Sequence, residues 1–404
     1  MTLPTSTGEE IVPLIVSATT PENQAASFRN QDQVWPVRAI RRGDAVRPLP
    51  PHVHSLADLT YEFDGVRLGV DDFMARRRTA GLLILKRGEI ALERYGLGNG
   101  PQSLWTSFST AKSMTATLAG AALHEGAIGS LDDPCEAYAP RLCGSAYEGV
   151  TIRNVLRMCS GVAWREDEDA DGRSEVYRLG RAMLSRRPGA ILDLMCKLPR
   201  AHRQGAVFNY STGESCVLAA VVAAAVGRPL ADYFAERVWG PAGMEADAHW
   251  QLESEGGLEI GGFGVSACLR DVGRFGLLML EDGEAFDGRR LLPVGWRDLA
   301  GRPDCPATAF GRPRPGDPSG YGYHWWVTAP VPGVHDGVFS ANGAYGQIIY
   351  VNPGEQVVAA IQSAGRQLQD SEAGLEAVML LRAAVRALRP TSQPSGASRR
   401  GLRG

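Results

Sequence analysis

Lysine is nearly missing from this 404-residue chain: only Lys86, Lys112 and Lys197 occur among 42 lysines and arginines. Arginine therefore supplies almost every surface cation. Arginine keeps its proton in a protein, whereas lysine can be brought to lose it and then act as a base. Each remaining lysine is therefore a candidate for proton-transfer chemistry that arginine cannot perform.

The chain also lacks an excess of charge and a long apolar run. Its 45 acidic residues leave a net charge of −3, which provides no basic surface for nucleic acid. The longest apolar run, Cys216–Val226, has eleven residues, fewer than the ~18–20 that span a bilayer. Since 44% of the residues are hydrophobic and 22% are charged, the composition is that of a globular protein with a large core.

Metal and disulfide patterns are missing too. The seven cysteines include no C-x-x-C pair, so neither a zinc site nor a disulfide framework is indicated. Asp167, Asp169 and Asp171 resemble the start of a calcium loop, but the last ligand position holds Arg178, which favours a solvated acidic loop. Met1–Thr20 contains no basic residue and does not form a secretory signal. We expect a cytoplasmic protein with reduced thiols, no metal, no cofactor, and no membrane or nucleic-acid partner.

The hydrophobic pattern along the chain predicts an α+β protein. Leu82–Lys86 and Ile90–Tyr95 alternate around Arg87-Gly88, as in a β-hairpin. Further strands are predicted over 323–327, 338–341, 347–351 and 357–362, and helices over 109–124, 152–158, 175–184, 191–198, 215–226, 269–280 and 372–388. This order predicts an extended lead-in over 1–55, a discontinuous α/β body over 56–130 and 251–389, a helical lobe inserted at 131–250, and a flexible tail over 390–404.

Ser109 and Lys112 stand at the start of the predicted helix 109–124. Three residues along a helix place both side chains on one face, ~4.5 Å apart along the axis. A serine hydroxyl is a weak nucleophile until a base takes its proton. A lysine amine does this only when uncharged, which burial and the positive end of a helix both favour. The Ser109 amide, in the first turn, could also bind an oxyanion. The same spacing arises by chance as well, so the pair alone does not establish this chemistry.

Two further segments contain candidate site residues. Tyr210 precedes the predicted helix 215–226, and a phenol beside a Ser–Lys pair can relay a proton and later activate water. Taken alone, it is better explained as a tyrosine packed at the start of a helix. Asn342, Gly343 and Ala344 follow a predicted strand, where a glycine lets a substrate backbone approach and offers a second N–H to the oxyanion. The alternative there is a bulge between strands.

Taken in order, these elements resemble the serine β-lactamase and penicillin-binding-protein superfamily. The resemblance covers about residues 75–365 and includes Ser-x-x-Lys at 109–112, Tyr-x-x at 210–212 and the strand motif that ends in Gly343. It is closest to the class C β-lactamase-like branch, which contains cytoplasmic esterases and 6-aminohexanoate-dimer hydrolases. The resemblance implies a β-lactamase/transpeptidase-like fold, in which helices flank an antiparallel sheet.

The resemblance also implies roles for the candidate residues. Ser109 would be the acylated nucleophile, Lys112 its base and Tyr210 the proton relay and deacylation partner. The oxyanion would lie between the Ser109 amide and an amide just after Gly343.

Some positions depart from the β-lactamase pattern. Thr212 stands where a β-lactamase has the Asn of Tyr-x-Asn, and Ala341-Asn342-Gly343 replaces the Lys-Thr-Gly whose cation holds a β-lactam carboxylate. The loop around Glu166–Asp169 lacks the tyrosine that the 6-aminohexanoate-dimer hydrolases use on amides. Four aromatic residues could line an acyl pocket or belong to the core, with the core favoured for the last: Trp164, Tyr323, Trp325 and Trp326.

The sequence therefore predicts a serine hydrolase that cleaves a small neutral ester or amide through an acyl-enzyme. The absence of G-x-S-x-G counts against an α/β-hydrolase fold. Two alternatives stay open: a β-lactamase or D,D-peptidase, and a non-catalytic scaffold with the same fold. The sequence does not indicate the oligomeric state.

Overall fold

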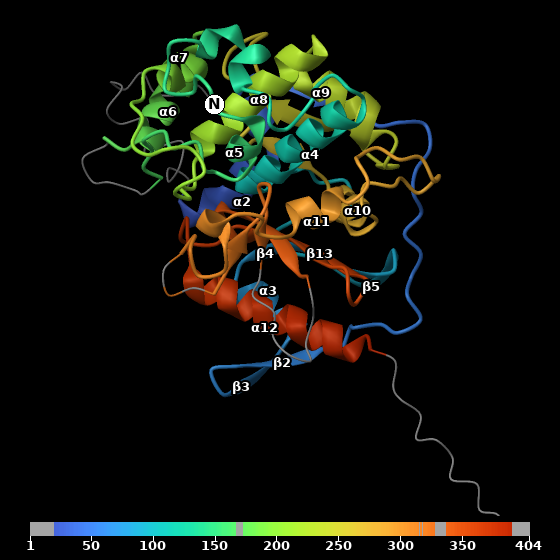
Figure 1. Cartoon of the computed structure of the whole chain (residues 1–404). Helices are drawn as coiled ribbons and strands as arrows, with labels where there is room; N and C mark the ends of the chain where they lie inside the picture. The colour runs from blue at the N-terminus through green and yellow to red at the C-terminus, as the bar shows by residue number, and fades with distance from the viewer. Residues whose placement is uncertain (1–19, 167–172, 315, 317, 328–336, 390–404) are drawn as a thin grey trace, which may run out of the picture.

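The computed structural model describes residues 20–389, except 167–172, 315, 317 and 328–336. Figure 1 shows a half built mainly of helices above a half built around a large sheet. The strands of that sheet are β4 (Thr79–Lys86), β5 (Glu89–Tyr95), β9 (Gly320–Tyr321), β10 (Trp326–Val327), β11 (Phe339–Gly343), β12 (Gln347–Asn352) and β13 (Val357–Ser363). Their order is β5-β4-β13-β12-β11-β10-β9, and every neighbouring pair is antiparallel. The predicted α+β class with an antiparallel sheet is confirmed.

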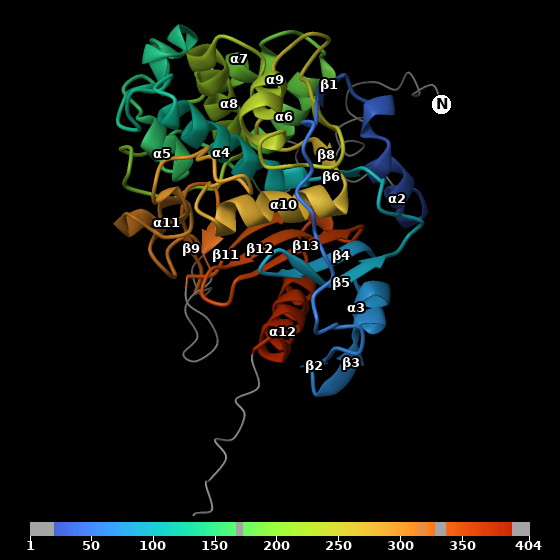
Figure 2. The same ribbon diagram turned by 90° about the vertical axis from the view of Figure 1, so that its right-hand side faces the viewer.

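Two helices, α10 (Leu269–Leu280) and α12 (Ser371–Ala387), cover opposite faces of this sheet (Figure 2). All eight residues of β4 are buried, and successive side chains of a strand point to opposite faces. Leu82 and Ile84 belong to the apolar cluster that contains α12, whereas Leu83 and Leu85 belong to the cluster that contains α10. Coverage of both faces explains why β4 is apolar throughout.

The helical half is built around two buried helices, α4 (Ala111–His124) and α8 (Thr212–Val226), which pack against each other. Both are rich in alanine and other small residues and are buried along most of their length, so neither needs a polar stripe. Around them lie α5 (Ile152–Leu156), α6 (Glu175–Leu184), α7 (Ala190–Cys196), α9 (Leu230–Phe234) and the π-helical turn Ala235–Trp239.

A smaller antiparallel sheet adjoins the helices, in the order β1 (Val37–Ile40), β7 (Ala248–Gln251), β8 (Val265–Ala267) and β6 (Trp105–Thr106). The other elements are α2 (Pro21–Arg29), β2 (Thr60–Phe63), β3 (Val66–Gly69), α3 (Val70–Arg76) and α11 (Trp296–Ala300). In the described part of the chain no single helix is long and apolar enough to cross a membrane. One pair of helices, α8 with Leu230–Trp239, has the necessary length and composition when taken together, but it is bent by 73°.

The structure differs from the sequence predictions in two segments. The lead-in 1–55, predicted to be extended, contains α2 and β1 in its described part. The pairing of β1 with β7, more than two hundred residues later, leaves no local pattern. The predicted strand 323–327 is confined to Trp326–Val327, because His324 has a left-handed φ of 59° that breaks the extended backbone.

Several other expectations are untested. The acidic loop Asp167–Asp171 and the tail 390–404 lie outside the described residues. The domain boundaries drawn from the sequence stay a prediction.

Candidate active site

Ser109 lies on the 3₁₀ turn η2 (Phe108–Thr110), which leads from β6 into α4. Phe108, immediately before it, has a φ of 45°, a left-handed conformation that costs energy in a residue other than glycine. The Phe108 ring is held by the rings of Phe28 and Tyr345, with centroids 4.9 and 5.2 Å away. The backbone at Ser109 is therefore a tight turn fixed by aromatic packing.

Lys112 faces Ser109 from the first turn of α4. Its Nζ lies 2.8 Å from Ser109 Oγ and also donates a hydrogen bond of 2.9 Å to the carbonyl of Gly262. The Lys112 side chain is buried, with 1% of the residue exposed, whereas Ser109 is partly exposed. The structure thus brings the predicted nucleophile and base into contact, with the amine away from water.

The segment Gly261–Gly262 passes between α4 and α8 at close range. A methyl group on Gly262 would stand 2.5 Å from Thr212 Cγ2 and 2.8 Å from the Thr212 carbonyl oxygen. The Gly261 carbonyl accepts a hydrogen bond of 2.7 Å from Thr115 Oγ1 of α4. Glycine is therefore required here, and its carbonyl holds the Lys112 amine.

Gly262→Ala should therefore lower both stability and activity. The added methyl group must displace the backbone of α8 or the carbonyl that holds Lys112, at a cost of ~1–3 kcal/mol. Urea unfolding and the rate of acylation by an activated ester measure the two effects. Gly100→Ala, at a glycine with open space around it, is the control and should change neither. An unaffected Gly262→Ala protein would contradict this packing.

Tyr210 is brought to the Ser–Lys pair by the beginning of α8. Its ring centroid lies 5.0 Å from Lys112 Nζ. Ser211 caps α8 by accepting a hydrogen bond of 3.1 Å from the Glu214 amide, which fixes the backbone next to Tyr210. The Tyr210 ring also stacks on Trp326, with centroids 5.6 Å apart and an interplanar angle of 27°.

The end of β11 lies against the nucleophile turn. A methyl group built on Gly343 would stand 2.8 Å from the Ser107 carbonyl oxygen and 3.2 Å from the Ser109 nitrogen. Ala344 opens the next turn, η7 (Ala344–Gly346), and Asn342 is a partly buried residue opposite Ile348 in β12. The strand edge predicted from the sequence therefore lies beside the Ser109 amide, and only a glycine fits at position 343.

A carboxylate without a predicted role, that of Glu166, lies at the amino end of α8. Glu166 accepts a hydrogen bond of 2.9 Å from the Thr212 amide and further bonds from the Thr212 hydroxyl and the Trp164 indole. Thr212 is the position where a β-lactamase has asparagine. Because 46 residues separate Glu166 from Thr212, no local signal could reveal the pair.

The other aromatic candidates have different places. Trp325 is fully buried and stacks on Phe275 with an interplanar angle of 10°, so it belongs to the core. The Tyr323 hydroxyl bonds to Arg153 and Asp304, at 2.7 and 2.8 Å, in a network of ion pairs. Trp326, 7% exposed, is buried as expected and also forms the wall behind Tyr210.

Two buried titratable groups flank the site. Burial lowers the pKa of His324 to about 3, so its ring is neutral, and its Nδ1 lies 3.2 Å from the Lys112 carbonyl oxygen. Because a carbonyl only accepts, Nδ1 carries the proton. Burial raises the pKa of Glu214 to about 8, and this carboxyl accepts a hydrogen bond from the Ser160 hydroxyl.

Across the described residues no group of three His, Cys, Asp or Glu side chains could hold a metal ion.

The raised pKa of Glu214 predicts that folding stability falls as pH rises. Between pH 4.5, the ordinary pKa of a glutamate, and about pH 8, its pKa in the folded protein, the folded protein binds this proton more tightly than the unfolded chain does. Raising the pH through this range therefore favours unfolding. Glu214→Gln should flatten the stability profile between pH 5 and 8, roughly that window. Urea unfolding across this range checks it. Glu255→Gln, at an exposed glutamate, should keep the wild-type dependence of unfolding free energy on pH. If Glu214→Gln also kept the wild-type dependence, the prediction would be wrong.

Comparison with known proteins shows the family of this chain. The family model described as Beta-lactamase matches residues 67–384. The 6-aminohexanoate-dimer hydrolase of Paenarthrobacter ureafaciens is 29% identical over 343 residues, covering 82% of this chain and 83% of that protein.

Solved structures share the fold. A protein from Bacillus anthracis, named as a candidate 6-aminohexanoate-dimer hydrolase, superposes with a TM-score of 0.78 at 22% identity, covering 89% of this chain and 93% of its own. EstCE1, a hydrolase with promiscuous acyltransferase activity, superposes with a TM-score of 0.63 at 17% identity, covering 78% and 96%. The extent of the family match shows that this chain belongs to the beta-lactamase family of serine hydrolases.

Proposed function

We propose that this protein hydrolyses a small neutral ester or amide through an acyl-enzyme on Ser109. The observation that carries the proposal is the 2.8 Å contact between the Ser109 hydroxyl and the buried Lys112 amine. A buried amine beside a hydroxyl is the arrangement that activates a serine when no histidine base is present.

The proposed cycle assigns one task to each group. Uncharged Lys112 takes the Ser109 proton while Oγ bonds to the substrate carbonyl carbon. The amides of Ser109 and Ala344 hold the oxyanion, and the bond to the leaving group breaks as that group receives a proton by way of Tyr210. Water then adds to the acyl carbon, and the acid departs as Ser109 recovers its proton.

The charges around the site support a substrate without a carboxylate. Ala341, Asn342 and Gly343 place no cation on the strand edge, and Glu166 puts a carboxylate at the start of α8 beside Thr212. The relative from Paenarthrobacter ureafaciens is named for an amide substrate, whereas the sequence favours ester and amide equally. We therefore propose either an ester or an amide bond as the one cleaved, a small molecule as the substrate, and the cytoplasm as the location.

One observation keeps a β-lactamase or D,D-peptidase as the second candidate. The Arg314 guanidinium lies 3.8 Å from the ring centroid of Trp326, which in turn stacks on Tyr210. A cation so close to the site could attract the carboxylate of a β-lactam.

A fluorophosphonate probe and a small substrate panel test the proposal. We expect one covalent label per chain on Ser109, turnover of p-nitrophenyl acetate and butyrate, and no turnover of nitrocefin. Amine release from the linear 6-aminohexanoate dimer distinguishes amide from ester activity. Nitrocefin turnover would favour the second candidate, and folded protein that is neither labelled nor active would favour a non-catalytic scaffold.

A further inference from the structure

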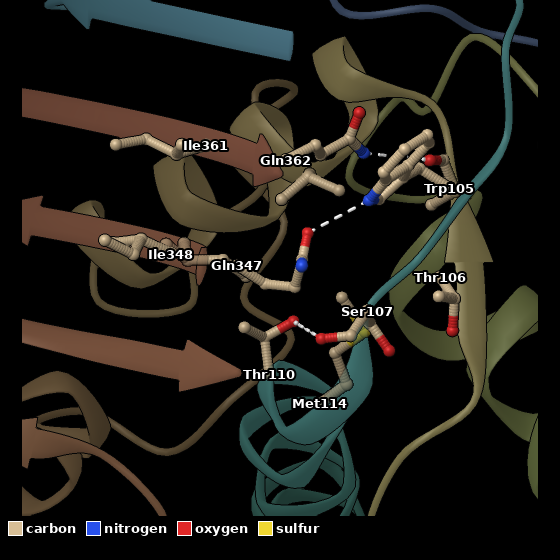
Figure 3. A pocket seen from close by; sticks show the side chains of 12 residues that line it. Trp105, Thr106, Ser107, Thr110, Met114, Gln347, Ile348, Ile361 and Gln362 are labelled. Carbon is tan, nitrogen blue, oxygen red and sulfur yellow. Dashed lines mark hydrogen bonds between the residues drawn. The ribbon is translucent and has the colours of Figure 1, made fainter. Parts of the chain in front are cut away.

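Gln347 is a buried residue whose side-chain amide bonds to segments on both sides of the proposed oxyanion site. It is the first residue of β12, directly after η7, and only 3% of it is exposed. Figure 3 shows its side chain pointing from the strand towards Trp105, at the edge of a small cavity. A primary amide has two N–H donors and an oxygen that accepts twice, and a buried group left unpaired destabilises the fold.

All four of these hydrogen bonds are made. Gln347 Oε1 accepts from Trp105 Nε1 at 3.0 Å and from the Ser363 amide at 3.1 Å. Gln347 Nε2 donates to the Ala344 carbonyl at 2.9 Å and to the Ser363 carbonyl at 2.7 Å. An indole N–H only donates and a carbonyl only accepts, so no other orientation of this amide satisfies its partners.

These partners belong to the segments that carry the two proposed oxyanion donors. Trp105 is on β6, four residues before Ser109, and Ala344 bears the second amide. Ser363 lies on the interior strand β13, and its amide and carbonyl both bond to Gln347 and anchor that side chain to the sheet. Gln347 therefore joins, through one side chain, the strand that leads into the nucleophile to the turn that faces it.

The turn that carries Ser109 and the turn that carries Ala344 both contain a residue with a strained backbone. Phe108, just before Ser109, and Tyr345, just after Ala344, have left-handed φ values of 45° and 60°. Such backbone persists only where its surroundings hold it. The contact of the two rings, at 5.2 Å, the packing of Phe28 on both, and the bonds of Gln347 all help to hold these turns together.

We infer that Gln347 is a positioning residue for acyl transfer: it sets the separation of the Ser109 and Ala344 amides. The inference rests on the proposed function, because it concerns the transition state of that reaction. An oxyanion hole acts through donors placed before the charge develops, so a shift of its donors lowers kcat more than it raises KM.

Gln347→Met, of similar length but without amide groups, tests this. With p-nitrophenyl butyrate we expect kcat to fall by about 100-fold, with KM changed by no more than about threefold. Binding of phenylboronic acid, whose tetrahedral adduct on Ser109 resembles the transition state, should weaken in parallel. The matched control is Gln362→Met: Gln362 lines the same cavity and bonds to the Ala267 carbonyl at 3.2 Å. It should lower the melting temperature but keep kcat within about threefold, as expected for an amide that donates its hydrogen bond to β8 and not to the turns of Ser109 or Ala344.

The outcomes separate this inference from the proposed function. If Gln347→Met and Gln362→Met lose equal stability and keep equal kcat, Gln347 has a structural role only and the inference is wrong. If the wild-type protein is not labelled by a fluorophosphonate, the proposed function itself fails.

Should Gln347→Met not fold, a second variant tests the inference. Trp105→Phe removes a single donor to Gln347 and should lower kcat by roughly 3–10-fold at unchanged KM, about the value of one hydrogen bond. An unchanged kcat in Trp105→Phe would also overturn the inference.

Discussion

Ser109→Ala should lose covalent labelling completely and lower ester turnover by about 10⁴-fold or more, as when a nucleophile is removed from a catalytic set that acts as a unit. The reason is local: Ser109 Oγ is the hydroxyl in contact with the Lys112 amine, and an alanine leaves the carbonyl carbon without a partner for acylation. Intact mass after incubation with a fluorophosphonate, together with p-nitrophenyl butyrate kinetics, measures both effects.

The fold should survive this substitution. Ser109 is partly exposed and alanine is well tolerated in the first turns of a helix. Ser113→Ala is the matched control, because it removes a buried hydroxyl one turn further along α4 that bonds to the His324 carbonyl at 2.7 Å. That variant should lose about 1 kcal/mol of stability yet remain labelled. Labelling of Ser109→Ala at the wild-type rate would assign the nucleophile to another residue.

Lys112→Arg should be nearly as inactive, with acylation slowed by about 10³-fold, within the range for loss of a general base. Arginine keeps a positive charge but cannot release its proton, so it cannot take the proton of Ser109. It is also larger than the space it would occupy, because the Lys112 amine is enclosed between Ser109 and the Gly262 carbonyl. Stopped-flow acylation by an activated ester gives the rate directly.

The chain offers an unusually close control for this change. Lys197→Arg makes the same substitution at an exposed lysine after α7, and it should leave acylation and stability unchanged. Lys112→Met provides a smaller, uncharged side chain in case the arginine perturbs packing, and it should be equally inactive. Substantial activity in Lys112→Arg would exclude a neutral amine as the base.

Short-range features of the fold were predictable from the sequence. The helices Glu175–Leu184 and Leu269–Leu280 were predicted with the bounds that the structure has, because each carries a strong amphipathic pattern. The hairpin around Arg87-Gly88 was also confirmed, because alternation and a turn signal lie within one short segment. The strand at 323–327 was mostly wrong, since aromatic residues favour a strand but His324 has a left-handed backbone.

The surroundings of the candidate site were not predictable in this way. Glu166 is linked to Thr212 across 46 residues, and Trp105 to Gln347 across 242. Each of these residues is an ordinary polar or aromatic side chain in its own segment. Only the packing of the segment around Glu166 against the start of α8, and of β6 beside β12, gives them partners.

By itself the sequence determined the pairing of Ser109 with Lys112, because three residues along a helix put two side chains on one face whatever surrounds the helix. It also determined the α+β order of elements, since periodicity is a property of neighbouring residues. Tertiary structure alone decided that the Lys112 amine is buried against Gly262, that Gly343 lies beside the Ser109 amide, and that Gln347 joins the two turns. The physical reason is that burial and hydrogen-bond partners depend on segments brought together from distant parts of the chain.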